Sequence, residues 1–328
     1  MLQDSLGYDF IGLTSISIVI LIFCILARLR PALAIILYVA LIFRVLLIFI
    51  DYSLFKLPDS SSDSLYFQLL AYEWSNYGFL NVFKYYTGAD SYFISWILAI
   101  VYSIFGQSEL LGKSLSLLFG MGGVFLVWTI ARKLWGQSVA NKAGWVVALF
   151  PSLALYSSII LRESYIYFFL LFALNGCIDW NRKKNFKSLI PVLLGFICAT
   201  FFHNIMIIGL IAFFFIVFFQ QFKIVLLKFL NFKIIIKPLL IVLIIALIVS
   251  VAILKEFRIS KIGSITNETS FSELIIKKNL DYNLGEAKYP SWLVIRSEME
   301  LIYKSPLRII YFLFSPFPWD IKKMSHLI

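Results

Sequence analysis

Residues 32–50 read ALAIILYVALIFRVLLIFI, an apolar run interrupted only by the charge of Arg44. Roughly 17–25 such residues are enough for a helix to cross the hydrocarbon core of a bilayer. A lone arginine is costly at that depth, so we expect it to pair with an inward-facing acid or to extend toward the interface. The run therefore predicts a transmembrane helix.

Similar runs recur along the chain and indicate the fold class. Hydrophobic residues make up 61% of the 328 residues, which is well above the roughly 45–50% apolar usage of soluble domains. We predict an all-α, polytopic transmembrane bundle of about nine spans, forming one integral-membrane domain over residues 1–328. The expected spans lie near residues 9–27, 32–50, 113–131, 143–159, 164–180, 188–205, 206–220 and 235–254, with a last one beginning near 306.

Composition also excludes several classes of function. All three cysteines lie inside apolar runs and there are only two histidines, so neither a disulfide framework nor a histidine-rich metal centre is expected. The net charge of +11 suggests nucleic acid, but no compact basic patch with interleaved aromatics supports that partner. Basic residues instead concentrate in four short connectors. They are Arg28, Arg30, Arg132, Lys133, Lys142, Arg182, Lys183, Lys184, Lys187, Lys223, Lys228, Lys233 and Lys237.

Basic connectors normally face the cytoplasm, and this rule defines an outer face. All four fit on the inner side if residues 92–105 lie in the outer interface as a juxtamembrane helix, because about 14 apolar residues are too few to cross. The outer face then receives region 51–112, a loop with juxtamembrane helices, and a second loop, 255–305. We expect a multi-pass protein of the bacterial cytoplasmic (inner) membrane with its active site on the outer face.

The polar stretch PDSSSDSLYF, residues 58–67, opens the first outer helix. Apolar residues recur at helical spacing after Asp63, and Gly78 is expected to end the helix. Asp63 would then lie at the N-terminus of an amphipathic helix on the membrane surface. Two interpretations stay open: Asp63 or its neighbour Ser62 only caps the helix, or Asp63 does chemistry.

Two turns of the same face carry further polar side chains. Pro151 should kink or fray its span, and the charged pair Arg162–Glu163 follows in an otherwise apolar stretch. Charges at membrane depth are often functional, although an interfacial pair with Arg162 reaching lipid headgroups is the alternative. His203 lies in a tight turn between two spans, where it could equally satisfy backbone carbonyls.

The topology thus places Asp63, Glu163, Arg162 and His203 on one membrane face. Two carboxylates can deprotonate an acceptor hydroxyl or hold a divalent cation such as Mg²⁺ or Mn²⁺. A cationic group at headgroup level can hold a lipid phosphate. Together they support glycosyl transfer from a lipid-phosphate donor at the outer leaflet.

The order of these features resembles the GT-C superfamily of membrane glycosyltransferases, including the protein mannosyltransferases and aminoarabinose transferases (glycosyltransferase family 39-like). Residues 63–71, DSLYFQLLA, are similar to the D-x-x-Y-x-x-x-x-A beginning of the family. Residues 104–150 look like its run of small-residue and Ala-rich helices. Residues 151–163, PSLALYSSIILRE, resemble the turn where members place a second acid. The likeness covers roughly residues 35–220.

The resemblance implies an integral-membrane glycosyltransferase that uses a polyprenyl-phosphate-linked sugar. The acceptor would be a glycan, lipid or protein of the cell envelope. Asp63 would be the general base, or a metal ligand together with Glu163 if a metal is used, and Glu163 the second acid. Arg162 and His203 would hold the donor phosphate, His203 standing where many relatives carry an arginine. Members run on with further spans, so the resemblance also implies a C-terminally truncated chain. The further candidates for substrate binding are Asp59, Tyr66 and Arg296.

Three alternatives remain. An O-antigen-type polysaccharide polymerase commonly relies on arginine-rich outer loops, and its active surface would be loop 255–305 with Arg296. A lipid or polysaccharide transporter would line its path with charges deep in several spans, of which Arg44 is the clear example. A non-catalytic membrane scaffold is the third.

Overall fold

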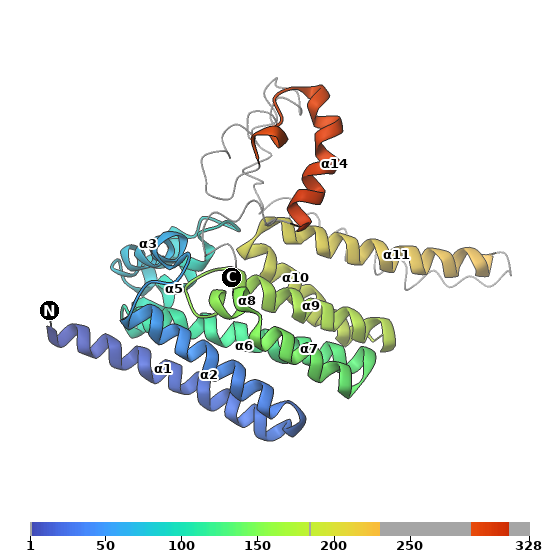
Figure 1. Ribbon diagram of the computed structural model, residues 1–328. Coiled ribbons are helices and arrows are strands. Elements are labelled where there is room, and N and C mark those ends of the chain that lie inside the picture. The colour runs from blue at the N-terminus through green and yellow to red at the C-terminus, as the bar shows by residue number, and fades with distance from the viewer. Residues whose placement is uncertain (1, 184, 230–289, 315–328) are drawn as a thin grey trace. The chain divides into compact units, whose positions relative to one another are not determined.

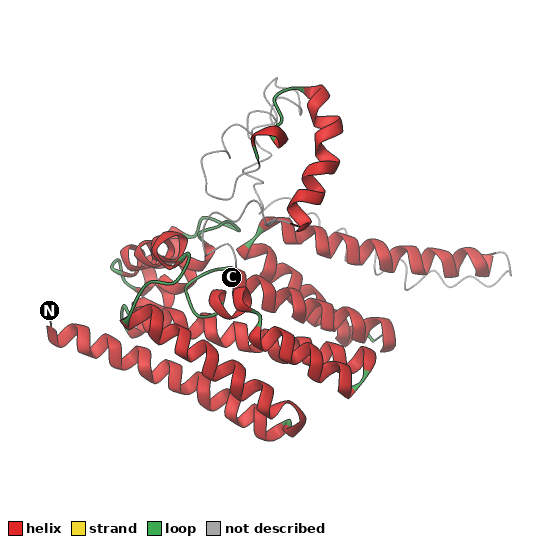
Figure 2. Ribbon diagram, in the orientation of Figure 1, coloured by secondary structure: helices red, strands yellow, loops and turns green. Residues whose placement is uncertain are grey.

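The computed structural model describes residues 2–183, 185–229 and 290–314. Helices and the turns between them make up these residues, and no strand occurs among them (Figure 2). The predicted all-α fold class is therefore confirmed. The chain divides into two compact units, Met1–Glu256 and Phe257–Ile328, which are described separately.

The first unit contains most of the helices. They are α1 (Leu2–Leu29), α2 (Pro31–Ser53), α3 (Leu65–Ser75), α4 (Phe79–Val82), α5 (Phe93–Phe105), α6 (Glu109–Trp135), α7 (Gln137–Leu149), α8 (Pro151–Tyr156), α9 (Glu163–Lys183), α10 (Leu189–Phe202) and α11 (Ile207–Phe229). The longer helices run side by side in this unit (Figure 1).

Three helices of the described chain are long and apolar enough to cross a membrane. The qualifying segments are Asp9–Leu29, Pro31–Ser53 and Glu109–Trp135. They coincide with the first three expected spans, so a membrane protein is supported. Helices α9, α10 and α11 lie where further spans were expected, but the count of about nine stays a prediction. The expected span 235–254 lies outside the described residues.

Helix α6 is the centre of the first unit, because α1, α2, α7 and α9 all pack against it. Aliphatic side chains and Trp128 fill the space between α1, α2, α6 and α7. A separate apolar cluster joins α9, α10 and α11. The residues that contribute most to the two clusters include Leu33, Leu37, Leu117, Met121, Ala173, Val192, Phe196 and Leu210.

A third cluster lies at one end of this bundle, where α3 and α5 gather (Figure 1). It includes Phe67 of α3, Leu98 of α5, Tyr165 of α9 and Phe202 of α10. Helix α5 has 13 residues, too few to span a bilayer, as predicted for a juxtamembrane helix. We call this end, with its cluster, the α3–α5 end.

The expected span 143–159 is broken in two. Helix α7 ends at Leu149 and α8 begins at Pro151, whose ring cannot donate a backbone hydrogen bond. Phe150 between them is extended, the conformation that proline imposes on the residue before it. The predicted disruption at Pro151 is confirmed, and it is a complete break.

The described part of the second unit consists of a short turn, Ser291–Leu293, and α14 (Glu298–Phe314). The helix begins eight residues before position 306, where the last span was expected to start, and it contains Pro306. Lys304 Nζ donates to the Val294 carbonyl at 2.9 Å and lies 3.0 Å from Glu300 Oε2. These contacts hold the turn against the helix.

Candidate functional site

The segment between α2 and α3 carries both predicted aspartates. Asp59 adopts a left-handed conformation, with φ of 63°, and a π-helical turn follows over Ser60–Ser64. The Asp59 carbonyl accepts hydrogen bonds from the Ser64 N–H at 3.3 Å and the Ser62 hydroxyl at 3.2 Å. Asp63 lies inside this turn, and its side chain is exposed.

The cap interpretation of Asp63 and Ser62 is wrong. Helix α3 begins at Leu65, its N-cap residue is Ser64, and no side chain caps it. Gly78 does not end this helix either, because α3 stops at Ser75 and Gly78, with φ of 82°, precedes α4. The π-helical turn inserted before Leu65 moves the helix start beyond both expected caps.

Ser64 joins this segment to the turn that precedes Glu163. Its hydroxyl accepts a hydrogen bond from the backbone N–H of Ile160 at 3.0 Å. Ser64 and Ile160 are 3% and 0% exposed, so the bond is shielded from water. The two predicted acidic segments are therefore in direct contact, one residue after Asp63 and three residues before Glu163.

The turn 157–162 is seated on α6 through small residues. A Cβ atom added at Gly120 would lie 2.1 Å from the Ser157 Cβ, and one added at Gly112 would lie 2.7 Å from Ile160 Cδ1. Only glycine allows this approach. The "small-residue helix" of the sequence thus provides the surface that receives the turn.

Arg44 holds the other side of the same turn. Its guanidinium donates to the carbonyls of Val147 and Ala148 at 3.2 and 2.8 Å, and to the Ser157 hydroxyl at 2.9 Å. The break at Pro151 leaves those carbonyls without their usual helical donors. Arg44 supplies the donors and places its charge at the negative end of α7. Neither expected role is met: the hydrogen-bond partners of Arg44 among the described residues are carbonyls and a hydroxyl, and the 1% exposed side chain does not extend outward.

Glu163 is the first residue of α9, where a carboxylate is favoured by the helix dipole. Its Oε1 lies 3.5 Å from Arg162 Nε, while Oε2 is buried and has no hydrogen-bond partner among the residues that the structure describes. The Arg162 side chain is 22% exposed. The pair therefore exists but is long, and one carboxylate oxygen remains for another ligand.

Burial raises the pKa of Tyr156, and the charges of Asp59 and Glu163 raise it further. Tyr156 is the last residue of α8, and sequence reasoning did not select it. A tyrosine ending a short apolar helix has no distinguishing pattern, so only the fold reveals this position.

His203 directly follows α10 in an extended conformation, and Asn204–Met206 forms a short turn into α11. The predicted tight turn is confirmed. The preceding residue, Phe202, stacks on Tyr165 with ring centroids 5.0 Å apart. This contact brings the turn to the start of α9.

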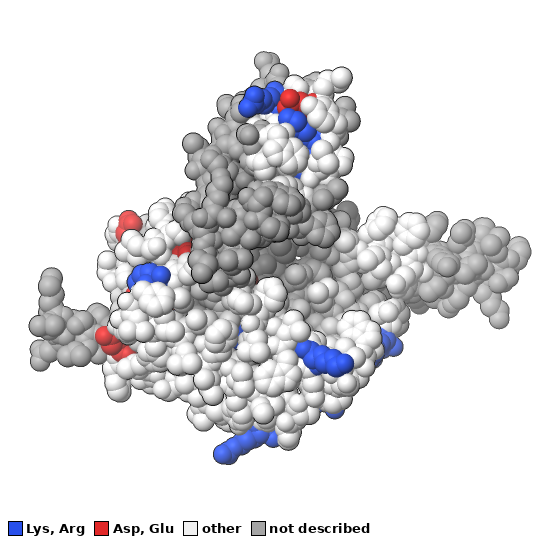
Figure 3. All heavy atoms as spheres, viewed as in Figure 1, with Lys and Arg blue, Asp and Glu red and all other residues white. Residues whose placement is uncertain are grey.

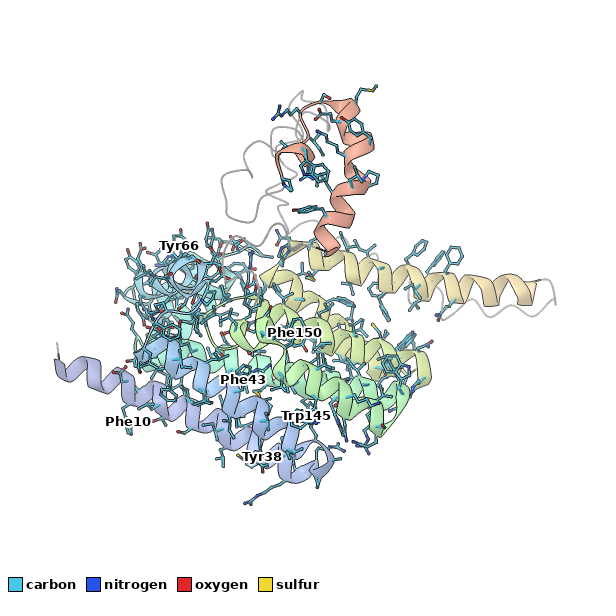
Figure 4. The ribbon with its side chains drawn as sticks, viewed as in Figure 1. Phe10, Tyr38, Phe43, Tyr66, Trp145 and Phe150 are labelled. Carbon is cyan, nitrogen blue, oxygen red and sulfur yellow. The ribbon has the colours of Figure 1, made fainter. Side chains whose placement is uncertain are left out.

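The structure thus brings four predicted residues to the α3–α5 end: Asp63, Arg162, Glu163 and His203. Tyr66 belongs to the same end (Figure 4). It is 53% exposed, and its ring lies 5.9 Å from that of Tyr92. On the face of this unit that Figure 3 shows, acidic side chains lie at that end together with some basic atoms, and further Lys and Arg lie toward the opposite end. The orientation in the membrane stays a prediction.

Arg296 lies in the second unit, just before α14. Its side chain is exposed, and its backbone N–H donates to Glu300 Oε2 at 2.8 Å. That bond, followed by the bond from Lys304, lowers the pKa of Glu300. Arg296 thus begins an ordered turn before α14.

A buried ion pair that the sequence reasoning missed lies below the segment with the aspartates. Lys113 Nζ is 2.6 Å from Asp51 Oδ2 and 2.5 Å from Glu109 Oε1. The sequence did contain an indication of this pair, because a lysine inside an apolar helix is energetically costly and is usually paired with an acid. The expected span began at 113, which left this lysine at its edge.

The described residues include no group of three His, Cys, Asp or Glu side chains suited to a metal ion. Asp63 and Glu163 remain the predicted ligands if a divalent cation binds. Comparison of the chain with protein-family models, with curated proteins and with solved structures found no match. The likeness to GT-C enzymes consequently rests on the residues quoted above.

Proposed function

We propose that this membrane protein is a glycosyltransferase that uses a polyprenyl-phosphate-linked sugar at the outer face of the bacterial inner membrane. The acceptor is a glycan, lipid or protein of the cell envelope. The proposal rests mainly on one observation, the Ser64–Ile160 hydrogen bond, which joins the segment with Asp63 to the turn before Glu163. Two acidic positions separated widely in sequence thus meet at one end of a membrane bundle.

The chemistry assigned to these residues is simple. Asp63 accepts the proton of the acceptor hydroxyl while the hydroxyl oxygen forms a bond to the anomeric carbon. The bond from that carbon to the phosphate oxygen breaks, and polyprenyl phosphate leaves with the electron pair. Arg162 and His203 hold the phosphate through charge-assisted hydrogen bonds. Glu163 orients Arg162, whose Nε lies 3.5 Å away, and Asp59 and Tyr66 line the approach of the substrate.

The test is a transfer assay with protein in liposomes and a panel of polyprenyl-phosphate-linked sugars. Asp63→Asn should lower the rate by about 10²- to 10⁴-fold, the usual contribution of a general base. Glu73→Gln is the matched control, because Glu73 is an exposed acid of α3 outside the site. A folded Asp63→Asn protein that transfers sugar at the wild-type rate contradicts the proposal.

The alternatives predict different outcomes in the same assay. A polymerase acting through the loop before α14 would lose activity in Arg296→Ala and keep it in Asp63→Asn. A transporter would move lipid-linked sugar without cleaving it. Against the transporter, the buried Arg44 charge is occupied by helix-end carbonyls and does not face a path.

A further inference from the structure

Asp51, near the end of α2, makes more contacts than an ion pair requires. Its Oδ2 accepts from Lys113 Nζ at 2.6 Å and from the Ser60 hydroxyl at 2.8 Å. Its Oδ1 accepts from the backbone N–H of Leu57 at 2.6 Å. A single carboxylate therefore ties α6 to two points of the segment that carries Asp59 and Asp63.

Lys113 also makes several contacts in this cluster. Its ammonium contacts both Asp51 and Glu109, and it lies 5.7 Å from the centre of the Tyr52 ring. The Lys113 and Asp51 side chains are 1% and 0% exposed. Such a group cannot touch a substrate, so it is not a catalytic residue.

Stability alone is a weak reason for this pair. Removing two charges from water costs about as much as their attraction returns, and well-packed apolar residues often replace such pairs without loss. What apolar residues cannot replace is the pair of acceptors that Asp51 offers to Leu57 and Ser60. The carboxylate orders the segment, and Lys113 holds that carboxylate in place through the 2.6 Å contact.

We propose that Asp51 and Lys113 are positioning residues that hold the 57–64 segment in register against the turn 157–162. Leu57 and Ser60 hold the segment to Asp51, and Ser64 holds it to Ile160. The claim that these contacts order the segment does not depend on the proposed function. Only the expected effect on sugar transfer rests on the proposed function. A displacement of about 1 Å at a reacting group can cost about 10²-fold in rate.

The experiment uses the full chain with its three cysteines replaced by alanine and a nitroxide label at Ser61→Cys, an exposed position of the segment. Ser60→Ala removes one contact point and leaves the ion pair intact. Asp51→Leu/Lys113→Met removes the pair without leaving a buried charge. Both variants should make the label more mobile and therefore narrow the lines of its electron paramagnetic resonance spectrum. Ser60→Thr keeps the hydroxyl and should retain the broad lines of the wild-type protein.

Lys56→Met is the matched control for the ion pair. Lys56 Nζ lies 2.8 Å from Glu109 Oε1 and 3.9 Å from Asp51 Oδ2, but its side chain is 47% exposed. Water screens so long and exposed a contact with Asp51, so its removal should leave the spectrum unchanged. In the transfer assay, Ser60→Ala should lower kcat about 10-fold or more and change KM by less than about 2-fold, because geometry and not donor affinity is lost. Lys56→Met should stay within about 2-fold of the wild-type kcat.

The outcomes separate the two proposals. An unchanged label spectrum in both folded variants overturns the positioning role, whatever the transfer rate. Narrowed spectra with no sugar transfer in the wild-type protein support the positioning role and overturn the proposed function. Narrowed spectra with kcat unchanged in Ser60→Ala show a mobile segment that catalysis tolerates, and they overturn the catalytic part of the inference.

Discussion

The hydroxyl of Ser64 accepts a hydrogen bond from the backbone N–H of Ile160, 96 residues further along the chain, at 3.0 Å. Both partners are buried. The bond connects the segment between α2 and α3, which carries Asp63, with the segment between α8 and α9, which precedes Glu163.

Ser64→Ala is predicted to destabilise the protein by about 1–3 kcal/mol, because the Ile160 N–H loses its acceptor in a buried place. Reversible denaturation in mixed micelles measures this difference. Ser61→Ala is the control: its side chain is exposed in the same turn, and its effect should stay within about 0.5 kcal/mol. Equal effects of the two variants on stability would contradict a stabilising hydrogen bond between Ser64 and Ile160.

Arg44→Met is predicted to destabilise the C-terminal end of α7 and the turn after it. The carbonyls of Val147 and Ala148 lose their charged donor. The Ala148 bond is buried and the Val147 bond is part-buried, and an unsatisfied buried carbonyl costs about 1–3 kcal/mol. Arg44→Lys should recover only part of this, because an ammonium does not reproduce the planar fork of guanidinium. Hydrogen exchange of residues 147–158 should increase in Arg44→Met and stay unchanged in Arg30→Met, an exposed arginine.

Gly120→Ala is predicted to destabilise, although alanine is worth up to about 1 kcal/mol more than glycine inside an isolated helix. The added Cβ would lie 2.1 Å from the Ser157 Cβ, and such overpacking typically costs about 1–3 kcal/mol. Thermal unfolding of the purified protein shows whether Gly120→Ala raises or lowers the stability. A stabilised Gly120→Ala protein would mean that the turn 157–162 is not seated against α6.

Glu300 should make the second unit sensitive to acid. Its pKa is lowered in the folded protein by the bonds from the Arg296 N–H and Lys304, so its contribution is present above the ordinary pKa of 4.5. The contribution is lost as the pH falls through the lower, folded value. The difference in unfolding temperature between wild type and Glu300→Gln should therefore shrink from about pH 7 to about pH 3. A constant difference contradicts this assignment.

Local patterns in the sequence predicted the local features. The apolar run 32–50 lies within α2, Pro151 breaks its helix, and His203 lies in a tight turn. Each depends on a residue and its near neighbours, through length, ring chemistry or periodicity. The distribution of charges predicted that Asp63 and Glu163 share one membrane face. The segments that carry them touch at one end of the bundle, and the membrane face itself stays a prediction.

Contacts between distant segments were not predictable in this way. The partners of Asp51 and Arg44 are set by how α2, α6 and α7 pack, and no periodic pattern announces a carbonyl that needs a donor. The expected cap at Asp63 failed for a related reason. A π-helical turn anchored by Asp51 and Ile160 shifted the start of α3, and tertiary contacts overrode the local preference.

The ion pair also sets an order of assembly during synthesis. Asp51 leaves the ribosome 62 residues before Lys113, and a charged carboxylate is not buried without its partner. Until α6 has packed beside α2, Asp51 stays hydrated and does not hold the 57–64 segment through Leu57 and Ser60. The end of the bundle that carries Asp63 is therefore ordered only after α6 has packed beside α2.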